Sequence, residues 1–124
     1  MKSAQDYLAE ANAIVPKIET QAGIAKHGQS GVVFVDVRDS AAIQESGTIA
    51  GALRIPRGFI EFAADQATQF HNPQMDKDAE IILVCGAGGQ AALAGRTLVE
   101  MGFKNVSNVG GFGAWKDEGG PFEA

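Results

Sequence analysis

Short apolar runs alternate along this chain with stretches of helical periodicity, and this alternation restricts the folds that the chain can adopt. Val32–Val35 is a continuous run of β-branched and aromatic residues, which is typical of a strand buried on both faces. Strand-length runs follow at Ala52–Ile55, Ile81–Val84 and Asn105–Val109. Strands that alternate with helices need crossover connections, so we expect one largely parallel sheet.

The segments between these runs carry helix signals. Ser3 followed by Asp6 resembles a capping box that opens a first helix, and Pro16 ends this helix. Thr20 is expected to N-cap a second helix that stops near Gly28. Further helices are expected at 41–46, 58–64, 90–101 and 112–118, and a loop at 65–80. The sequence therefore predicts an α/β fold with helices flanking the sheet.

Composition limits the class of protein. We expect a single domain over residues 1–124, because 124 residues with 45% hydrophobic and 20% charged side chains match one soluble globular unit. The formal net charge is −5 and the ten basic residues are scattered singly, so neither nucleic acid nor a membrane is an expected partner. The polar start of the chain lacks a signal-peptide core. A single cysteine cannot form an intrachain disulfide, and a free thiol favours a cytoplasmic location.

That cysteine, Cys85, stands where a reactive thiolate is expected. It follows the apolar run Ile81–Val84 and precedes the glycine-rich turn Gly86–Gly89, which leads into a helical pattern. The strand would deliver the sulfur to the carboxyl end of the sheet, where ligands bind in such folds. Glycines allow consecutive backbone N–H groups to point inward, and a helix N-terminus adds partial positive charge. All three features favour the thiolate over the thiol.

Four motifs occur in order. They are residues 35–39 (Val-Asp-Val-Arg-Asp), residues 51–56 (Gly-Ala-Leu-Arg-Ile-Pro), the cysteine loop of residues 85–91 (Cys-Gly-Ala-Gly-Gly-Gln-Ala), and residues 109–115 (Val-Gly-Gly-Phe-Gly-Ala-Trp). In this order and spacing they resemble the rhodanese (sulfurtransferase) family over nearly the whole chain. The resemblance implies a three-layer α/β domain with a five-stranded, mainly parallel sheet flanked by helices. It also implies an enzyme that needs no cofactor, whose cysteine takes sulfane sulfur from a donor such as thiosulfate or a persulfide. The persulfide so formed would pass its sulfur to cyanide, a small thiol or a protein thiol.

The same resemblance suggests the residues of the site. Cys85 would be the nucleophile, and the loop after it would bind the anionic sulfur through Gly86, Ala87, Gly88, Gly89, Gln90 and Ala91. Many members carry an arginine where this chain has Gln90, and often another where it has Gly86. Loss of one charge-assisted hydrogen bond, about 1.5–3 kcal/mol, would weaken capture of a dianionic donor roughly ten- to a hundredfold. We expect Arg57, just beyond the strand that ends at Pro56, to supply the missing charge.

The same loop leaves three alternatives to sulfur transfer. The main alternative is a catalytically weak or inactive rhodanese-like binding or regulatory module, because the loop arginines are missing. A Walker-type phosphate loop would need Lys followed by Ser or Thr where Gln90-Ala91 stand. Phosphatase or arsenate reductase chemistry is a third hypothesis, which the absence of an arginine clamp disfavours. Arg96 lies beyond the loop and is expected to be solvated.

The remaining chemistry-bearing residues are interpreted as structural. His27 and His71 have no second ligand at helical spacing, so we expect surface residues and no metal site. Asp36 and Arg38 alternate at the end of a central strand and are expected to hold the next turn by hydrogen bonds. Three aromatic residues are expected in the core: Phe112, Trp115 and Phe122.

Overall fold

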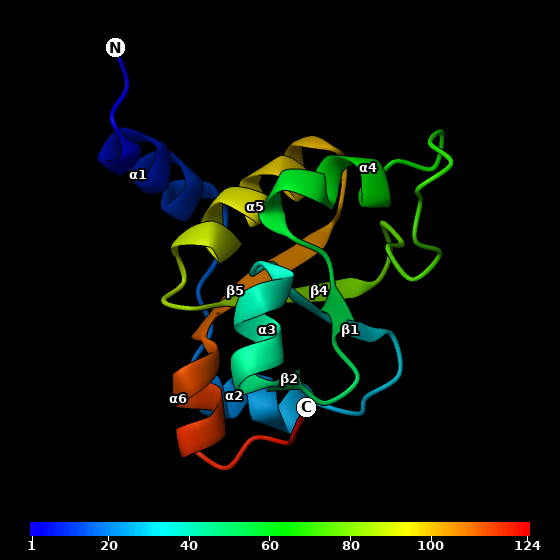
Figure 1. Cartoon of the computed structure of the whole chain (residues 1–124). Helices are drawn as coiled ribbons and strands as arrows, with labels where there is room; N and C mark the ends of the chain where they lie inside the picture. Colours follow the sequence, from blue (N-terminus) through cyan, green and yellow to red (C-terminus); the bar gives the residue numbers. More distant parts are fainter.

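Four parallel strands form the central sheet of the computed structural model, which describes residues 1–124 (Figure 1). They are β1 (Val32–Asp36), β3 (Leu53–Arg54), β4 (Glu80–Cys85) and β5 (Asn105–Gly111), and their order in the sheet is β3-β1-β4-β5. These are the four strands predicted from the apolar runs. The two most apolar runs form β1 and β4, which lie in the middle of the sheet. These two strands pair with each other, and Phe34 of β1 lies opposite Ile82 of β4.

The predicted fifth strand is absent. Beyond β5 the chain makes a single parallel bridge between Lys17 and Asn108, and Pro16 stands directly before it. Because proline has no N–H to donate, the ladder cannot continue past Pro16 toward the N-terminus. A separate antiparallel pair joins β2 (Thr48–Ile49) to β6 (Phe122–Glu123), two strands too short to be detected as apolar runs.

Helices cover both faces of the sheet, as predicted. Figure 1 shows α1, α4 and α5 on one face and α2, α3 and α6 on the other. Their bounds are α1 (Ala4–Ile14), α2 (Thr20–Lys26), α3 (Ser40–Ser46), α4 (Ile60–Ala64), α5 (Gly89–Glu100) and α6 (Phe112–Asp117), with a 3₁₀ turn η1 (Arg57–Phe59) before α4. None of these helices combines the length and apolar character needed to cross a membrane.

Each face of the sheet has its own hydrophobic core. Ile81 and Leu83 of β4 point into the core beneath α4 and α5, whereas Ile82 and Val84 point into the core that contains Trp115 of α6. Successive side chains of a strand point to opposite faces, so a strand covered on both faces must be apolar at every position. This requirement explains the uninterrupted apolar run before Cys85.

Most helix signals are confirmed with small changes in boundaries. The Ser3 hydroxyl accepts a hydrogen bond from Asp6 N–H and the Asp6 carboxylate accepts one from Ser3 N–H, so the predicted capping box is present. Gly102 follows α5 with φ +96°, the left-handed conformation expected of a C-terminal glycine. Thr20 is the first residue of α2 rather than its cap, because Glu19 takes the cap position.

Four predictions about side-chain environment are wrong, and one of them concerns His71, which is partly buried with its Nε2 3.2 Å from the Met75 carbonyl oxygen. Phe122 is 50% exposed because it lies on the short strand β6 at the rim of the molecule, although Phe112 and Trp115 are buried as predicted. His27 is partly buried: its ring packs near Phe34 and Trp115, and its Nε2 lies 2.7 Å from the Ala50 carbonyl oxygen. Arg96 is not simply solvated, because it donates to the carboxylate of Glu10 on α1.

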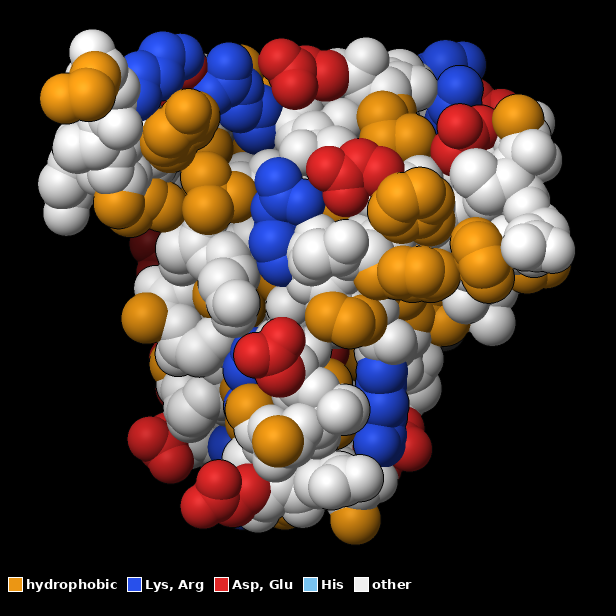
Figure 2. Space-filling model, turned by 45° about the horizontal axis from the view of Figure 1, so that its top comes forward, with side chains coloured by type: hydrophobic (Ala, Val, Ile, Leu, Met, Phe, Trp, Pro, Cys, Tyr) orange, Lys and Arg blue, Asp and Glu red, His pale blue; other side chains and the backbone are white.

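The surface carries mixed charge and one apolar cluster. On the face in Figure 2, Lys and Arg side chains are interspersed with Asp and Glu, and hydrophobic side chains gather at the upper left and at the right. The exposed rings of Phe59, Phe62 and Phe70 pack against one another, with Phe59 5.6 Å from Phe62 and 5.5 Å from Phe70 between ring centroids. The cluster shields part of its own apolar area while leaving the rest in water.

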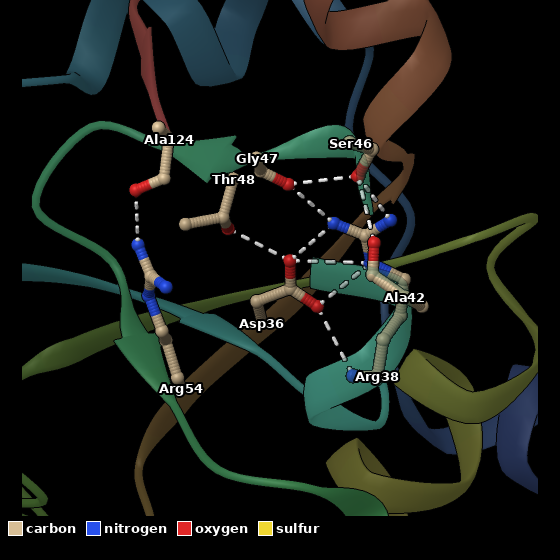
Figure 3. Close-up of polar contacts among 8 residues, drawn as sticks. All are labelled: Asp36, Arg38, Ala42, Ser46, Gly47, Thr48, Arg54 and Ala124. Carbon is tan, nitrogen blue, oxygen red and sulfur yellow. Dashed lines mark hydrogen bonds and ion pairs between the residues drawn. The ribbon is translucent and has the colours of Figure 1, made fainter. Parts of the chain in front are cut away.

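A buried ion pair closes the carboxyl end of β1 (Figure 3). Asp36 is fully buried, and Arg38 binds its carboxylate through Nε and Nη2, the latter at 2.8 Å. Thr48 Oγ1 donates to the same carboxylate at 2.7 Å, and Arg38 also reaches the Gly47 carbonyl oxygen. The predicted turn contact is present as well, because Arg38 N–H donates to Asp36 Oδ1. The pair therefore ties the turn after β1 to the α3–β2 connection.

Arg38→Ala should destabilise the protein by about 3–5 kcal/mol, because it leaves the Asp36 carboxylate buried without a counter-charge. Arg54→Ala is the matched control, since Arg54 pairs with Glu123 at 3.9 Å with both side chains more than 40% exposed, and should cost less than about 1 kcal/mol. Urea denaturation followed by circular dichroism measures both. Equal losses in the two variants would contradict a structural role for the Asp36–Arg38 pair.

Candidate active site

The thiol of Cys85 is enclosed by the turn that connects β4 to α5. Cys85 ends β4, its side chain is buried, and its Sγ accepts a hydrogen bond from Gly88 N–H at 3.0 Å. A second backbone donor, Ala91 N–H, lies 3.4 Å from the same sulfur. Both donors come from the start of α5, whose N-terminus also carries partial positive charge. The arrangement stabilises negative charge on the sulfur with backbone groups alone.

The six predicted loop residues contribute unequally. Only Gly88 and Ala91 donate hydrogen bonds to Sγ. Gly88 has φ +99°, a left-handed conformation in which a side chain would be strained, so glycine is needed at this position to aim its N–H at the sulfur. Gly86 and Gln90 are exposed, and neither the Gln90 side chain nor any other loop side chain forms a hydrogen bond to Cys85. Ala87 is exposed as well, and Gly89 is partly buried.

Asn108, which the sequence analysis did not single out, holds the loop in place. It is 3% exposed on β5, and its Nδ2 donates to the Gly88 carbonyl oxygen at 2.9 Å. Its Oδ1 accepts from Gly110 N–H at 2.8 Å. A buried amide with both ends bonded fixes the peptide between Gly88 and Gly89, which directly follows the N–H group that faces the sulfur. An asparagine inside an otherwise buried strand was the signal that could have identified it, because an unpaired amide there would be costly.

The loop also rests against the end of β5. Cys85 pairs with Gly111 in the parallel ladder, after a register shift between Leu83 and Val84. A Cβ atom at Gly111 would collide with the Gly86 carbonyl oxygen. The φ of Gly111 is −94°, which any residue adopts, so glycine is required here for space and not for backbone conformation.

The structure does not bring Arg57 to the cysteine loop. Its Nη2 donates to Thr97 Oγ1 at 3.3 Å, and its Nη1 pairs with Glu61 at 3.5 Å. Thr97 lies two turns along α5 from the loop, so the guanidinium lies beside the C-terminal half of that helix. Any contribution of Arg57 to donor binding would require its side chain to leave both contacts.

Charge elsewhere at the site is sparse. The segment 85–91 contains no lysine or arginine. No group of three or more His, Cys, Asp or Glu side chains is placed to hold a metal ion. The sulfur of Cys85 therefore has two backbone N–H donors and no cationic side chain of this segment around it.

Comparison with known proteins places these features in context. The family model described as the Rhodanese-like domain matches residues 20–118. Thiosulfate sulfurtransferase GlpE of Coxiella burnetii is 33% identical over 86 residues, which cover 68% of this chain and 72% of GlpE. YrkF of Bacillus subtilis, named as a sulfur carrier protein, is 26% identical over 88% of this chain, which spans only 55% of YrkF.

Two solved structures have the same fold. A Rhodopseudomonas palustris protein, RPA3614, described as of unknown function and a possible tyrosine phosphatase, superposes with a TM-score of 0.93 at 38% identity, covering 99% of this chain and 96% of that one. The polysulfide-sulfur transferase of Wolinella succinogenes superposes with a TM-score of 0.75 at 25% identity, covering 94% of this chain and 83% of that one.

Gly111→Ala should slow alkylation of Cys85 by iodoacetamide about fivefold or more, because the added methyl group displaces the Gly86 carbonyl and with it the N–H groups that face the sulfur. Gly113→Ala is the matched control, since a Cβ atom there meets nothing within 4 Å. Thermal denaturation of both variants verifies that they are folded at the assay temperature. Unchanged alkylation in folded Gly111→Ala would show that the loop does not depend on this close approach.

Proposed function

This chain belongs to the rhodanese-like domain family, and on that premise we propose that it is a sulfurtransferase that carries sulfane sulfur on Cys85. The observation that supports this role best is the pair of backbone N–H groups, from Gly88 and Ala91, directed at the buried sulfur. Such donors stabilise the anionic sulfur before, during and after transfer without a cofactor. The names of relatives such as GlpE support the same class of reaction.

In the first half of the reaction, the Cys85 thiolate attacks the outer sulfur of the donor. With thiosulfate, a new bond forms between Sγ and that sulfur, the S–S bond of the donor breaks, and its electron pair leaves with sulfite. In the second half, an acceptor nucleophile attacks the outer sulfur of the Cys85 persulfide, and the electron pair of the broken bond returns to Sγ. In both halves the N–H groups of Gly88 and Ala91 stabilise the negative charge on Sγ by hydrogen bonds.

The choice of donor depends on the missing cations. A dianion such as thiosulfate would meet no side-chain positive charge in the segment 85–91 of a chain with net charge −5. A persulfide brings one negative charge at its reacting end, and a long polysulfide dianion keeps its second charge at the far end, so either needs less compensation at the loop than thiosulfate. The likeness to the polysulfide-sulfur transferase of W. succinogenes is in keeping with this preference. We therefore propose a persulfide or polysulfide as the better donor and thiosulfate as the weaker one.

Two other functions deserve a direct comparison. A non-catalytic binding module would retain the loop without accepting sulfur, and Gln90 at the place of the usual arginine favours it. The description of the R. palustris structure raises phosphatase activity for that protein. Hydrolysis of phosphate esters needs a cation to hold the phosphoryl oxygens, and the segment 85–91 supplies none. Turnover of p-nitrophenyl phosphate or of arsenate would favour that chemistry over sulfur transfer.

Incubation with thiosulfate or with a polysulfide should add one sulfur atom to the protein, visible by intact mass spectrometry, because Cys85 accepts the outer sulfur. Cyanide should remove the added sulfur and release thiocyanate. The Cys85→Ser variant should acquire no sulfur from either donor. If the native protein also acquires none, the binding-module function replaces sulfur transfer.

Gln90→Arg should raise kcat/KM for thiosulfate about ten- to a hundredfold, because it restores one charge-assisted hydrogen bond to the donor. Gln90 is exposed, so the substitution should leave stability unchanged. Gln74→Arg makes the same charge change on an exposed residue in the loop before β4, at the opposite edge of the sheet, and should have no effect. An equal gain in both variants would point to net charge alone.

Arg57→Ala in the same assay tests the remaining cation. Because its guanidinium contacts Glu61 and Thr97, we expect kcat/KM for thiosulfate to stay within about twofold. A tenfold loss would mean that Arg57 turns toward the loop when the donor binds.

A further inference from the structure

We propose that a pocket beside the cysteine loop binds the sulfur acceptor, and that this acceptor is a small thiol carrying both a carboxylate and an ammonium group. This inference rests on the proposed sulfur transfer for its chemistry, although the binding itself does not. The pocket has a volume of about 530 Å³, within the range of about 300–1,000 Å³ typical of small-molecule sites. Its walls come from α1, the segment 17–20, the cysteine loop, the end of β5 and α6.

The pocket adjoins the sulfur site through shared residues. Gly88 lines the pocket, and its N–H lies 3.0 Å from Cys85 Sγ. Gly111 also lines it and is the direct strand partner of Cys85. Asn108 lines it as well while bonding the Gly88 carbonyl oxygen. A molecule held in this pocket therefore lies against the same peptide groups that surround the sulfur.

The charges in the pocket indicate the class of ligand. Lys17 is the only lysine or arginine among the lining residues, and Glu19 is the only acidic one. Both side chains are exposed and neither forms an ion pair. By contrast, all four arginines of the chain are paired with carboxylates. A dianion would gain from Lys17 but be repelled by Glu19, whereas a zwitterion satisfies both.

The wall that supplies these charges is outside the matched family domain. The family model begins its match at residue 20, and the pocket takes five lining residues from before that point: Leu8, Asn12, Lys17, Ile18 and Glu19. The pocket is thus built partly by α1 and the segment that follows it, outside the residues that the family model matches. A wall in this position beside the loop is suited to selecting a substrate and is not needed for the sulfur chemistry.

Helix α1, which forms one wall of the pocket, packs against α5. Ala11 of α1 is fully buried, and Leu8 approaches Gly89 at the start of α5. Glu10 accepts hydrogen bonds from Lys2 and from Arg96 of α5, and these contacts hold the pKa of the Glu10 carboxyl below its usual range. A carboxyl with a lowered pKa keeps its charge, and therefore this anchor, until the pH falls through that lowered value.

The transfer to such an acceptor balances without a further reactant. The thiol loses its proton to water, and the resulting thiolate attacks the outer sulfur of the Cys85 persulfide. A new S–S bond forms on the acceptor, the bond to Sγ breaks, and its electron pair stays on Sγ as thiolate. Lys17 and Glu19 orient the acceptor and take no part in the bond changes.

Binding can be measured without any chemistry. The probe is S-methylglutathione, which carries two carboxylates and one ammonium group, titrated into the Cys85→Ser variant and followed by the amide NMR signals of the protein. We expect shifts concentrated at Gly88, Gly89 and Gly110. Lys17→Ala should weaken binding about fivefold, whereas Lys77→Ala, an equal charge change on an exposed lysine outside the pocket, should not.

Two more variants separate charge from shape. Glu19→Gln should weaken S-methylglutathione and leave S-methyl-3-mercaptopropionate, which has no ammonium group, unchanged or tighter. Ala114→Phe places a large side chain on the exposed pocket face of α6 and should block both probes. Absence of binding to Cys85→Ser, or equal weakening by Lys17→Ala and Lys77→Ala, would overturn the acceptor site.

Discharge of the persulfide tests the catalytic consequence. Glutathione should remove the added sulfur from persulfidated Lys17→Ala about fivefold more slowly than from the native protein, while cyanide, which is too small to use the pocket, should act on both at the same rate. Equal rates with glutathione would remove the acceptor site but keep sulfur transfer. Failure to form the persulfide would remove sulfur transfer, and the NMR titration would still decide whether the pocket binds the zwitterion.

Discussion

Strands β4 and β5 pair in parallel as far as Cys85 and Gly111, and this last pair brings two backbone turns into direct contact. The carboxyl ends of parallel strands lie at one edge of the sheet, so the turn after β4 and the turn after β5 must occupy neighbouring space. A side chain does not fit at Gly111, because the Gly86 carbonyl oxygen occupies the space that a Cβ atom would need. The position of the cysteine loop follows from this contact.

Backbone groups, and no cationic side chain of the segment 85–91, surround the sulfur of Cys85. Two N–H groups face the sulfur, and the buried amide of Asn108 fixes the peptide that directly follows the Gly88 N–H group. Backbone donors of this kind do not reorganise during a reaction, which favours the stabilisation of charge at one atom. They provide no long-range attraction for a compact dianion such as thiosulfate, which is why a persulfide or polysulfide is the proposed donor.

The segment before residue 20 changes what surrounds this common loop. Pro16 has no N–H with which to continue the pairing toward the N-terminus, and the chain bridges β5 only at Lys17 before it turns into α2. Lys17 and Glu19 lie at the pocket, and neither forms an ion pair. The proposed acceptor selection depends on these two charges.

The sequence by itself determined the elements whose signals are local. The apolar runs of β1 and β4, the capping box at Ser3 and the glycine turn after Cys85 each act within a few residues, so their outcome could be predicted. Side-chain partners far apart in the chain could not be predicted in this way. Arg57 binds Thr97, and the predicted core residue Phe122 is half exposed at the rim. Only the tertiary structure decided these contacts, because they depend on how the strands are ordered and on which turns become neighbours.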